Sequence, residues 1–187
     1  MMQQKIKEKS YKQMLWFSMI SMTMMFAGLT SAYVVSKSRE DWVGFDLPQA
    51  FYISTLLIVL SSVTFYLAKR FAKKDAQSKS TVSLVLTLVL GLGFVYFQFQ
   101  GFQQLIDAGL YFTGKESNVS SSFLYVITLA HLIHIFVGIL VLITVVYQNI
   151  KGKYTSANIL GLELGAIFWH FVDILWIYLF LFFYFIG

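Results

Sequence analysis

The residues best able to do chemistry lie in an apolar stretch near the C-terminus, residues 161–184, which contains Glu163, His170 and Asp173. On a helix, Glu163 and His170 are seven residues apart and nearly superimposed, and Asp173 follows one turn later. The three side chains therefore share one face of a predicted helix. Exposing such groups to lipid is costly, so we expect protein to surround them.

The preceding apolar segment carries two histidines, His131 and His134, which lie one turn apart on a common helical face. His131 is about ten residues from the outer end of its predicted helix, and His170 is about ten residues from the inner end of the next one. Because consecutive spans run antiparallel, both histidines come near the middle of the membrane. We expect them to approach each other.

Three interpretations compete for these five candidate residues, His131, His134, Glu163, His170 and Asp173. In the first, which we favour, they satisfy one another by hydrogen bonds and charge pairing, hold the last two helices together, and order a lipid headgroup or a water chain. In the second, His170 and one of the other histidines ligate haem or a metal ion. In the third, His170 and Asp173 belong to a proton or quinone route.

The composition places the chain among membrane proteins. Of its 187 residues 58% are hydrophobic and only 12% are charged, whereas charged residues make up about a quarter of an average soluble protein. The net charge of +5 does not indicate nucleic-acid binding, because no connecting segment is long enough to fold separately. The absence of cysteine excludes disulfides, iron-sulfur clusters and thiolate metal sites.

Five apolar segments are long enough to span a bilayer as helices. A polar, basic N-terminus, residues 1–13, precedes them, and the first segment is too long for a signal peptide. We therefore predict an all-α integral membrane protein with one five-helix domain over residues 14–187. Its helices are expected at about 14–35, 48–68, 81–105, 122–147 and 159–186.

The distribution of charge predicts how the chain is oriented in the membrane, and its small residues predict where helices pack closely. Eleven of the 14 Lys and Arg residues lie in the N-terminus and in the second and fourth connections, which predicts a cytoplasmic N-terminus and a periplasmic C-terminus. Gly161 and Gly165 form a G-x-x-x-G pair that would let a neighbouring backbone approach closely.

The last segment closely resembles the final helix of subunit III of haem-copper terminal oxidases, whose members read much like E-x-G-x-x-x-W-H-F-V-D-x-x-W. The sequence "AHLIHIFVG" is similar to that family's H-x-x-H-x-x-x-G, and "MFAGLTSAY" and "FYISTLLIVLSSVT" resemble its weaker patterns. The matching residues include Glu163, Gly165, Trp169, His170, Asp173, Trp176, His131, His134 and Gly138. We expect Gly138, Gly161, Gly165, Trp169 and Trp176 to serve in helix packing.

The chain also departs from longer members of that family. It begins at their third helix, so the two-helix bundle on one side of their lipid-holding cleft is missing or comes from another chain. Met22 stands where many members carry an intramembrane glutamate, and Phe102 and Gln103 replace a frequent Ser-Glu pair. No carboxylate role is available at these positions.

The resemblance implies a non-catalytic subunit III in a bacterial inner membrane, with no catalytic, cofactor-binding or metal-binding residue of its own. In the family, haem and copper lie in partner subunits. This subunit packs beside catalytic subunit I, with subunit II in the same complex, binds phospholipid, and supports oxygen access and proton uptake. The complex reduces oxygen to water and pumps protons. Alternatives are subunit III of a quinol oxidase, a nitric oxide reductase-associated homologue, or an independent haem-binding or proton-transfer protein.

Overall fold

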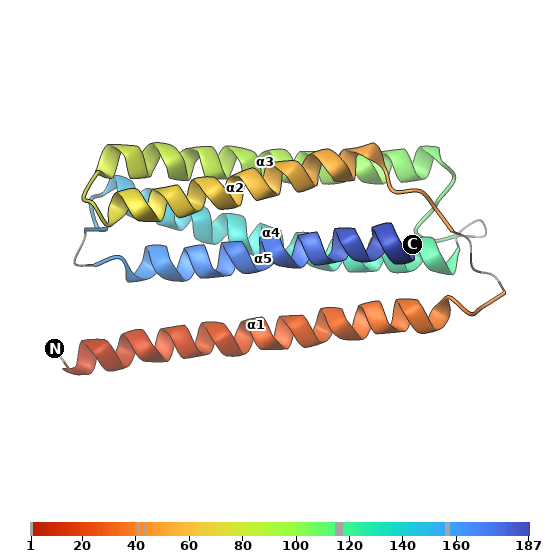
Figure 1. Ribbon diagram of the computed structural model, residues 1–187, viewed down its shortest axis with the longest axis horizontal. Coiled ribbons are helices and arrows are strands. Elements are labelled where there is room, and N and C mark those ends of the chain that lie inside the picture. Colours follow the sequence, from red (N-terminus) through yellow and green to blue (C-terminus); the bar gives the residue numbers. More distant parts are fainter. Residues whose placement is uncertain (1, 41, 43, 115–117, 156–157) are drawn as a thin grey trace.

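Five long helices make up the structure, a computed structural model that describes residues 2–40, 42, 44–114, 118–155 and 158–187 (Figure 1). Each helix is long and apolar enough to cross a membrane. The predicted all-α architecture with five spans is therefore confirmed. The helices are α1 (Met2–Ser36), α2 (Gln49–Ala72), α3 (Gln77–Asp107), α4 (Val119–Ile150) and α5 (Leu160–Ile186).

Four of the five helices are longer than the apolar segments that predict them, and only α5 keeps nearly its expected length. The largest difference is in α1, which begins at Met2, so the basic N-terminus continues the helix instead of preceding it. A bilayer needs only about 20 helical residues. The additional turns therefore carry polar residues beyond the hydrocarbon.

Glycines end two of the helices by the same motif. After α3, Gly109 has φ +79° and donates its N–H to the carbonyl of Ile106, while Leu110 N–H bonds the carbonyl of Leu105. After α4, Gly152 has φ +69° and repeats this pattern on Asn149. Only glycine adopts this left-handed conformation without a steric penalty, so both helices stop here and the chain reverses.

Helices α2, α3, α4 and α5 form a ring in which each contacts two neighbours, whereas α1 lies outside the ring. Among the described residues α1 contacts α4 and α5 but neither α2 nor α3. In Figure 1 the N-terminus and the α2–α3 and α4–α5 connections lie at one end of the bundle, and the C-terminus lies at the other. The basic segments therefore gather at one end.

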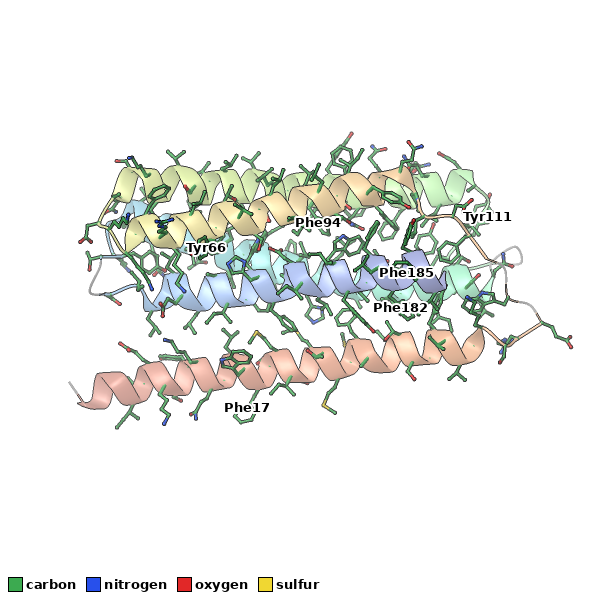
Figure 2. The ribbon with its side chains drawn as sticks, in the orientation of Figure 1. Phe17, Tyr66, Phe94, Tyr111, Phe182 and Phe185 are labelled. Atoms are coloured by element: carbon green, nitrogen blue, oxygen red, sulfur yellow. The ribbon has the colours of Figure 1, made fainter. Side chains whose placement is uncertain are left out.

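Large aromatic side chains fill the middle of the ring. Trp169 and Trp176 of α5 and Phe94 of α3 are almost completely buried, and Figure 2 shows Phe94 between the helices. Phe94 packs edge-on against Trp176, with ring centroids 5.3 Å apart. By contrast Phe17 on α1 is largely exposed and points away from the bundle in Figure 2, as expected of a lipid-facing side chain.

Candidate functional site: the polar seam between α2 and α5

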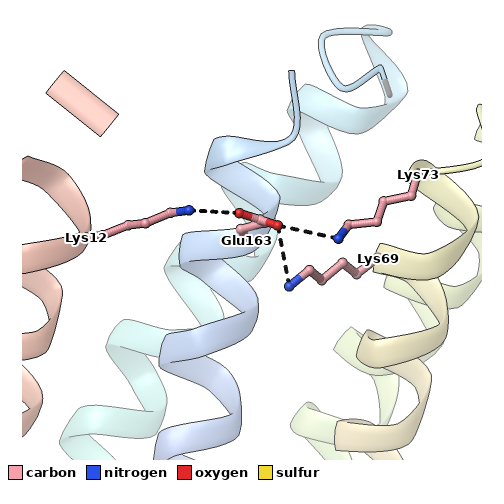
Figure 3. A network of polar contacts seen from close by, with 4 residues as sticks. All are labelled: Lys12, Lys69, Lys73 and Glu163. Atoms are coloured by element: carbon pink, nitrogen blue, oxygen red, sulfur yellow. Dashed lines mark hydrogen bonds and ion pairs between the residues drawn. The ribbon is translucent and has the colours of Figure 1, made fainter. Parts of the chain in front are cut away.

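Glu163, in the first turn of α5, is paired with three lysines (Figure 3). Its Oε2 lies 3.1 Å from Lys12 Nζ of α1, and its Oε1 lies 3.6 Å from Lys69 Nζ and 3.7 Å from Lys73 Nζ of α2. Glu163 therefore links two helices that do not contact each other directly. The carboxylate side chain is 21% exposed and that of Lys12 is 43% exposed, so water and salt screen these pairs.

His170 lies two turns further along α5 and bonds to α2. Its Nδ1 is 2.6 Å from the hydroxyl oxygen of Ser62. Asp173 is 1% exposed and lies beside the same serine. The Ser62 hydroxyl is a hydrogen-bonding neighbour of its carboxyl group, although neither carboxyl oxygen has a partner of regular hydrogen-bond geometry among the described residues. The polar face of α5 thus turns toward α2.

The two histidines of α4 lie elsewhere. His131 is fully buried and stacks on Trp176 of α5, with ring centroids 5.3 Å apart. The rings of Phe26 and Phe94 form edge-type contacts with it, each at a centroid distance of 6.2 Å. Neither ring nitrogen of His131 has a partner in the described part of the chain. His134 Nδ1 lies 2.7 Å from the carbonyl oxygen of Ala130, one turn back on its own helix.

The expectation that the five candidate residues bond to one another across α4 and α5 is therefore wrong for the described structure. Glu163, His170 and Asp173 do share one face, but α2 is the helix opposite that face. His131 and His134 face aromatic rings and their own backbone. Helical periodicity relates side chains on one helix and leaves open which neighbouring helix they meet.

The residues of α2 that contact the polar face of α5 were not predicted from the sequence, although their spacing could be read there. Thr55, Ser62 and Lys69 are seven residues apart and so lie on one face of α2. The indole Nε1 of Trp176 donates to the Thr55 hydroxyl at 2.9 Å. We call the resulting antiparallel set of contacts the polar seam: Thr55 with Trp176, Ser62 with His170, and Lys69 with Glu163.

The predicted packing residues lie at close helix contacts. A Cβ added at Gly138 would be 3.3 Å from the Trp169 ring, and one at Gly165 would be 3.0 Å from Val145 Cγ2 of α4. A Cβ added at Gly161 would be 2.6 Å from the Tyr154 hydroxyl, in the connection before α5. The nearest neighbours of this G-x-x-x-G pair are thus side chains, whereas close backbone approach was expected.

The two histidines considered as axial ligands, His131 and His170, lie in different surroundings among the described residues. No three His, Asp or Glu side chains come together there in a way that could hold a metal ion. The imidazole of His131 is surrounded by Trp176, Phe26 and Phe94, and His170 is already bonded to Ser62. The two histidines that would serve as axial ligands therefore have separate protein surroundings.

Comparisons with known proteins point to one family. A family model described as cytochrome c oxidase subunit III matches residues 7–187. Cytochrome c oxidase subunit 3 of Thermostichus vulcanus is 30% identical over 170 residues, covering 87% of this chain and 80% of the relative.

Two further relatives differ in length and in name. Probable cytochrome c oxidase subunit 3 of Rickettsia felis is 32% identical over 145 residues, covering 76% of this chain and 49% of that longer protein. Cytochrome bo(3) ubiquinol oxidase subunit 3 of Buchnera aphidicola is 29% identical over 189 residues, covering 98% of this chain and 90% of the relative. The chain belongs to the cytochrome c oxidase subunit III family, the non-catalytic third subunits of haem-copper oxidases.

Proposed function

We propose that the chain is subunit III of a bacterial cytochrome c oxidase and lies in the plasma membrane beside the catalytic subunit. One observation carries this proposal. Two of the ionisable side chains on the polar face of α5, Glu163 and His170, make contacts with α1 and α2 that join helices. Such a chain assists a neighbouring subunit through its shape and its lipid contacts. Haem and copper, and the reduction of oxygen coupled to proton pumping, belong to the partner subunits.

The arrangement of charge supports an orientation with the N-terminus in the cytoplasm. Lys12, Lys69 and Lys73 meet around Glu163 at the end of the bundle that carries the N-terminus and the α2–α3 and α4–α5 connections (Figures 1 and 3). Cytoplasmic segments carry an excess of lysine and arginine. The C-terminus then faces the periplasm.

A cavity between α1, α4 and α5 supports phospholipid binding. It has a volume of about 460 Å³ and is lined mainly by apolar side chains, including Leu15, Val141 and Phe168. It lies one turn from Lys12, whose charge attracts anionic headgroups. An acyl chain in the cavity with its phosphate near the basic end fits this distribution of apolar and charged surface.

Cytochrome c is the proposed electron donor of the whole complex, because the family model and the Thermostichus relative carry that name. The Buchnera relative, named for a ubiquinol oxidase, supports quinol as the second candidate. The donor binds other subunits, so the intact complex must be assayed. Turnover with reduced cytochrome c but not with quinol is the expected result, and the reverse favours the second candidate.

The proposal is tested by purifying the tagged chain from its native membranes in a mild detergent. The haem-containing catalytic subunit should co-purify in a constant ratio, and the separated chain should have no Soret absorption band. Failure of the catalytic subunit to co-purify would contradict the proposal. A stoichiometric Soret band on the isolated chain would instead favour an independent haem protein.

A further inference from the structure

The outer face of α5 forms the floor of a trough. Helices α1 and α2 both contact α5, but among the described residues they do not contact each other. A groove of about 320 Å³ lies between α2 and α5, and one of about 350 Å³ lies between α1 and α5. Ile174 lines both grooves and is 66% exposed. The trough is therefore a concave surface with Ile174 near its middle.

The groove on the α2 side has a polar floor within apolar walls. Ser62, His170 and Asp173 line it together with Val59, Val63 and Ile177. Ser62 satisfies only one ring nitrogen of the half-buried His170, and no contact of the other ring nitrogen is found among the described residues. Asp173 lies beneath, 1% exposed, with the Ser62 hydroxyl as its hydrogen-bonding neighbour. A buried polar group without a partner is costly, especially inside a bilayer. This floor is thus a site at which another molecule would supply hydrogen bonds.

The depth of this polar floor excludes lipid headgroups as the source of those bonds. Asp173 is 13 residues from Leu160 and 13 from Ile186, the two ends of α5, and so lies at the middle of the span. The hydrocarbon core is about 30 Å thick, which keeps headgroups about 15 Å from its centre. Acyl chains do reach this depth, but they offer no hydrogen-bond donor or acceptor.

We infer that the trough is the face that docks on the catalytic subunit, and that one transmembrane helix of that subunit lies along α5 with a hydrogen-bonding side chain opposite His170. This inference rests on the proposed function and adds the surface and the chemistry of contact. A helix fits the elongated space between α1 and α2, and a polar side chain at mid-membrane supplies what lipid cannot. The apolar walls pack against the rest of that helix.

Photocrosslinking in the assembled complex tests the docking face. A benzophenone amino acid at Ile174 reports on the trough, and the same probe at Leu92 is the matched control. Leu92 lies at the middle of α3 and is 52% exposed. In native membranes the Ile174 probe should crosslink to a mid-membrane peptide of the catalytic subunit, and the Leu92 probe should not. Crosslinks from Ile174 to lipid only, or to a second copy of this chain, would overturn the inference.

Two tryptophan variants, which add bulk at either site, test the docking face independently through retention of the chain by the catalytic subunit. Ile174→Trp narrows the trough, and Leu92→Trp adds the same bulk on the control face. Overpacking at this contact should lower retention of the chain by the catalytic subunit about tenfold. We expect that loss for Ile174→Trp alone. If unmodified chain co-purifies with the catalytic subunit and only Leu92→Trp releases it, the docking face is wrong while the proposed function stands. If the unmodified chain itself fails to co-purify, the proposed function fails first.

Discussion

Ser62 of α2 and His170 of α5 meet at 2.6 Å near the middle of two antiparallel membrane helices. This contact lies between the Thr55 to Trp176 hydrogen bond on one side and the Lys69 to Glu163 ion pair on the other. The three contacts form the polar seam, which holds α5 in one rotation and register against α2. Other registers would leave the Trp176 indole N–H and the His170 imidazole without these partners in hydrocarbon.

The central contact of the polar seam should make a modest but measurable contribution to the free energy of unfolding. Ser62→Ala removes the hydroxyl that bonds His170 Nδ1, so we expect a loss of about 0.6 kcal/mol and at most about 1.7, the range found for interhelical hydrogen bonds in membranes. Thermal unfolding in detergent measures it. Ser83→Ala is the control, because Ser83 is likewise half-buried but its hydroxyl donates to the Lys79 carbonyl of its own helix. Equal effects of the two variants would count against the seam.

Trp169 of α5 limits the size of residue 91 on α3. A Cβ at Gly91 would lie 2.8 Å from Trp169 Cη2, and the indole cannot move freely because its Nε1 donates a hydrogen bond to Ser61 at 3.0 Å. Gly91→Ala should therefore destabilise the chain by about 1–3 kcal/mol. Gly28→Ala has open space and should be neutral in the same assay. Similar stability of the two alanine variants would show that the Trp169 site is looser than described.

The lysines around Glu163 should contribute a small, salt-dependent stability. Each partly exposed pair is worth about 0.2–1 kcal/mol. Glu163→Gln should cost more than Lys12→Gln, because it leaves three cations together without their carboxylate. The difference between variant and unmodified chain should shrink as salt approaches about 1 M, where the screening length is about 3 Å. A penalty independent of salt would contradict this electrostatic account.

His131 should tolerate replacement by phenylalanine. Its ring nitrogens have no partner in the described part of the chain, and aromatic rings surround it. His131→Phe keeps a ring of similar size and removes the cost of burying unpaired polar atoms, so stability should be unchanged or higher. His170→Phe is the comparison, since it breaks a hydrogen bond. A loss of more than about 2 kcal/mol in His131→Phe would indicate a hydrogen-bond partner.

The spans could be predicted from the sequence because hydropathy is summed over about 20 residues, which makes their number insensitive to errors at the ends. The ends themselves were less predictable. Residues 2–13 continue α1 because nothing in that segment breaks a helix, and a polar composition does not end one outside the bilayer. Thus the apolar part of each helix could be identified, and its full length could not.

The site was only half predictable for a geometric reason. Spacing places Glu163, His170 and Asp173 on one face, and the structure agrees. Spacing does not say how α5 is rotated relative to its neighbours, so α4 was expected where α2 lies. The stripe of Thr55, Ser62 and Lys69 was present in the sequence. Serine and threonine commonly bond their own helix backbone, so such a stripe does not by itself indicate a partner helix.

The position of α1 has a consequence for biosynthesis. Its only two neighbours in the described structure, α4 and α5, leave the ribosome after α2 and α3. Helix α1, which is made before them, must therefore wait in lipid until α4 and α5 follow, and Lys12 meets Glu163 only after α5 has begun to form. Docking of α1 is then the closing step of folding, and a chain truncated before α5 leaves its first helix without half of its binding surface.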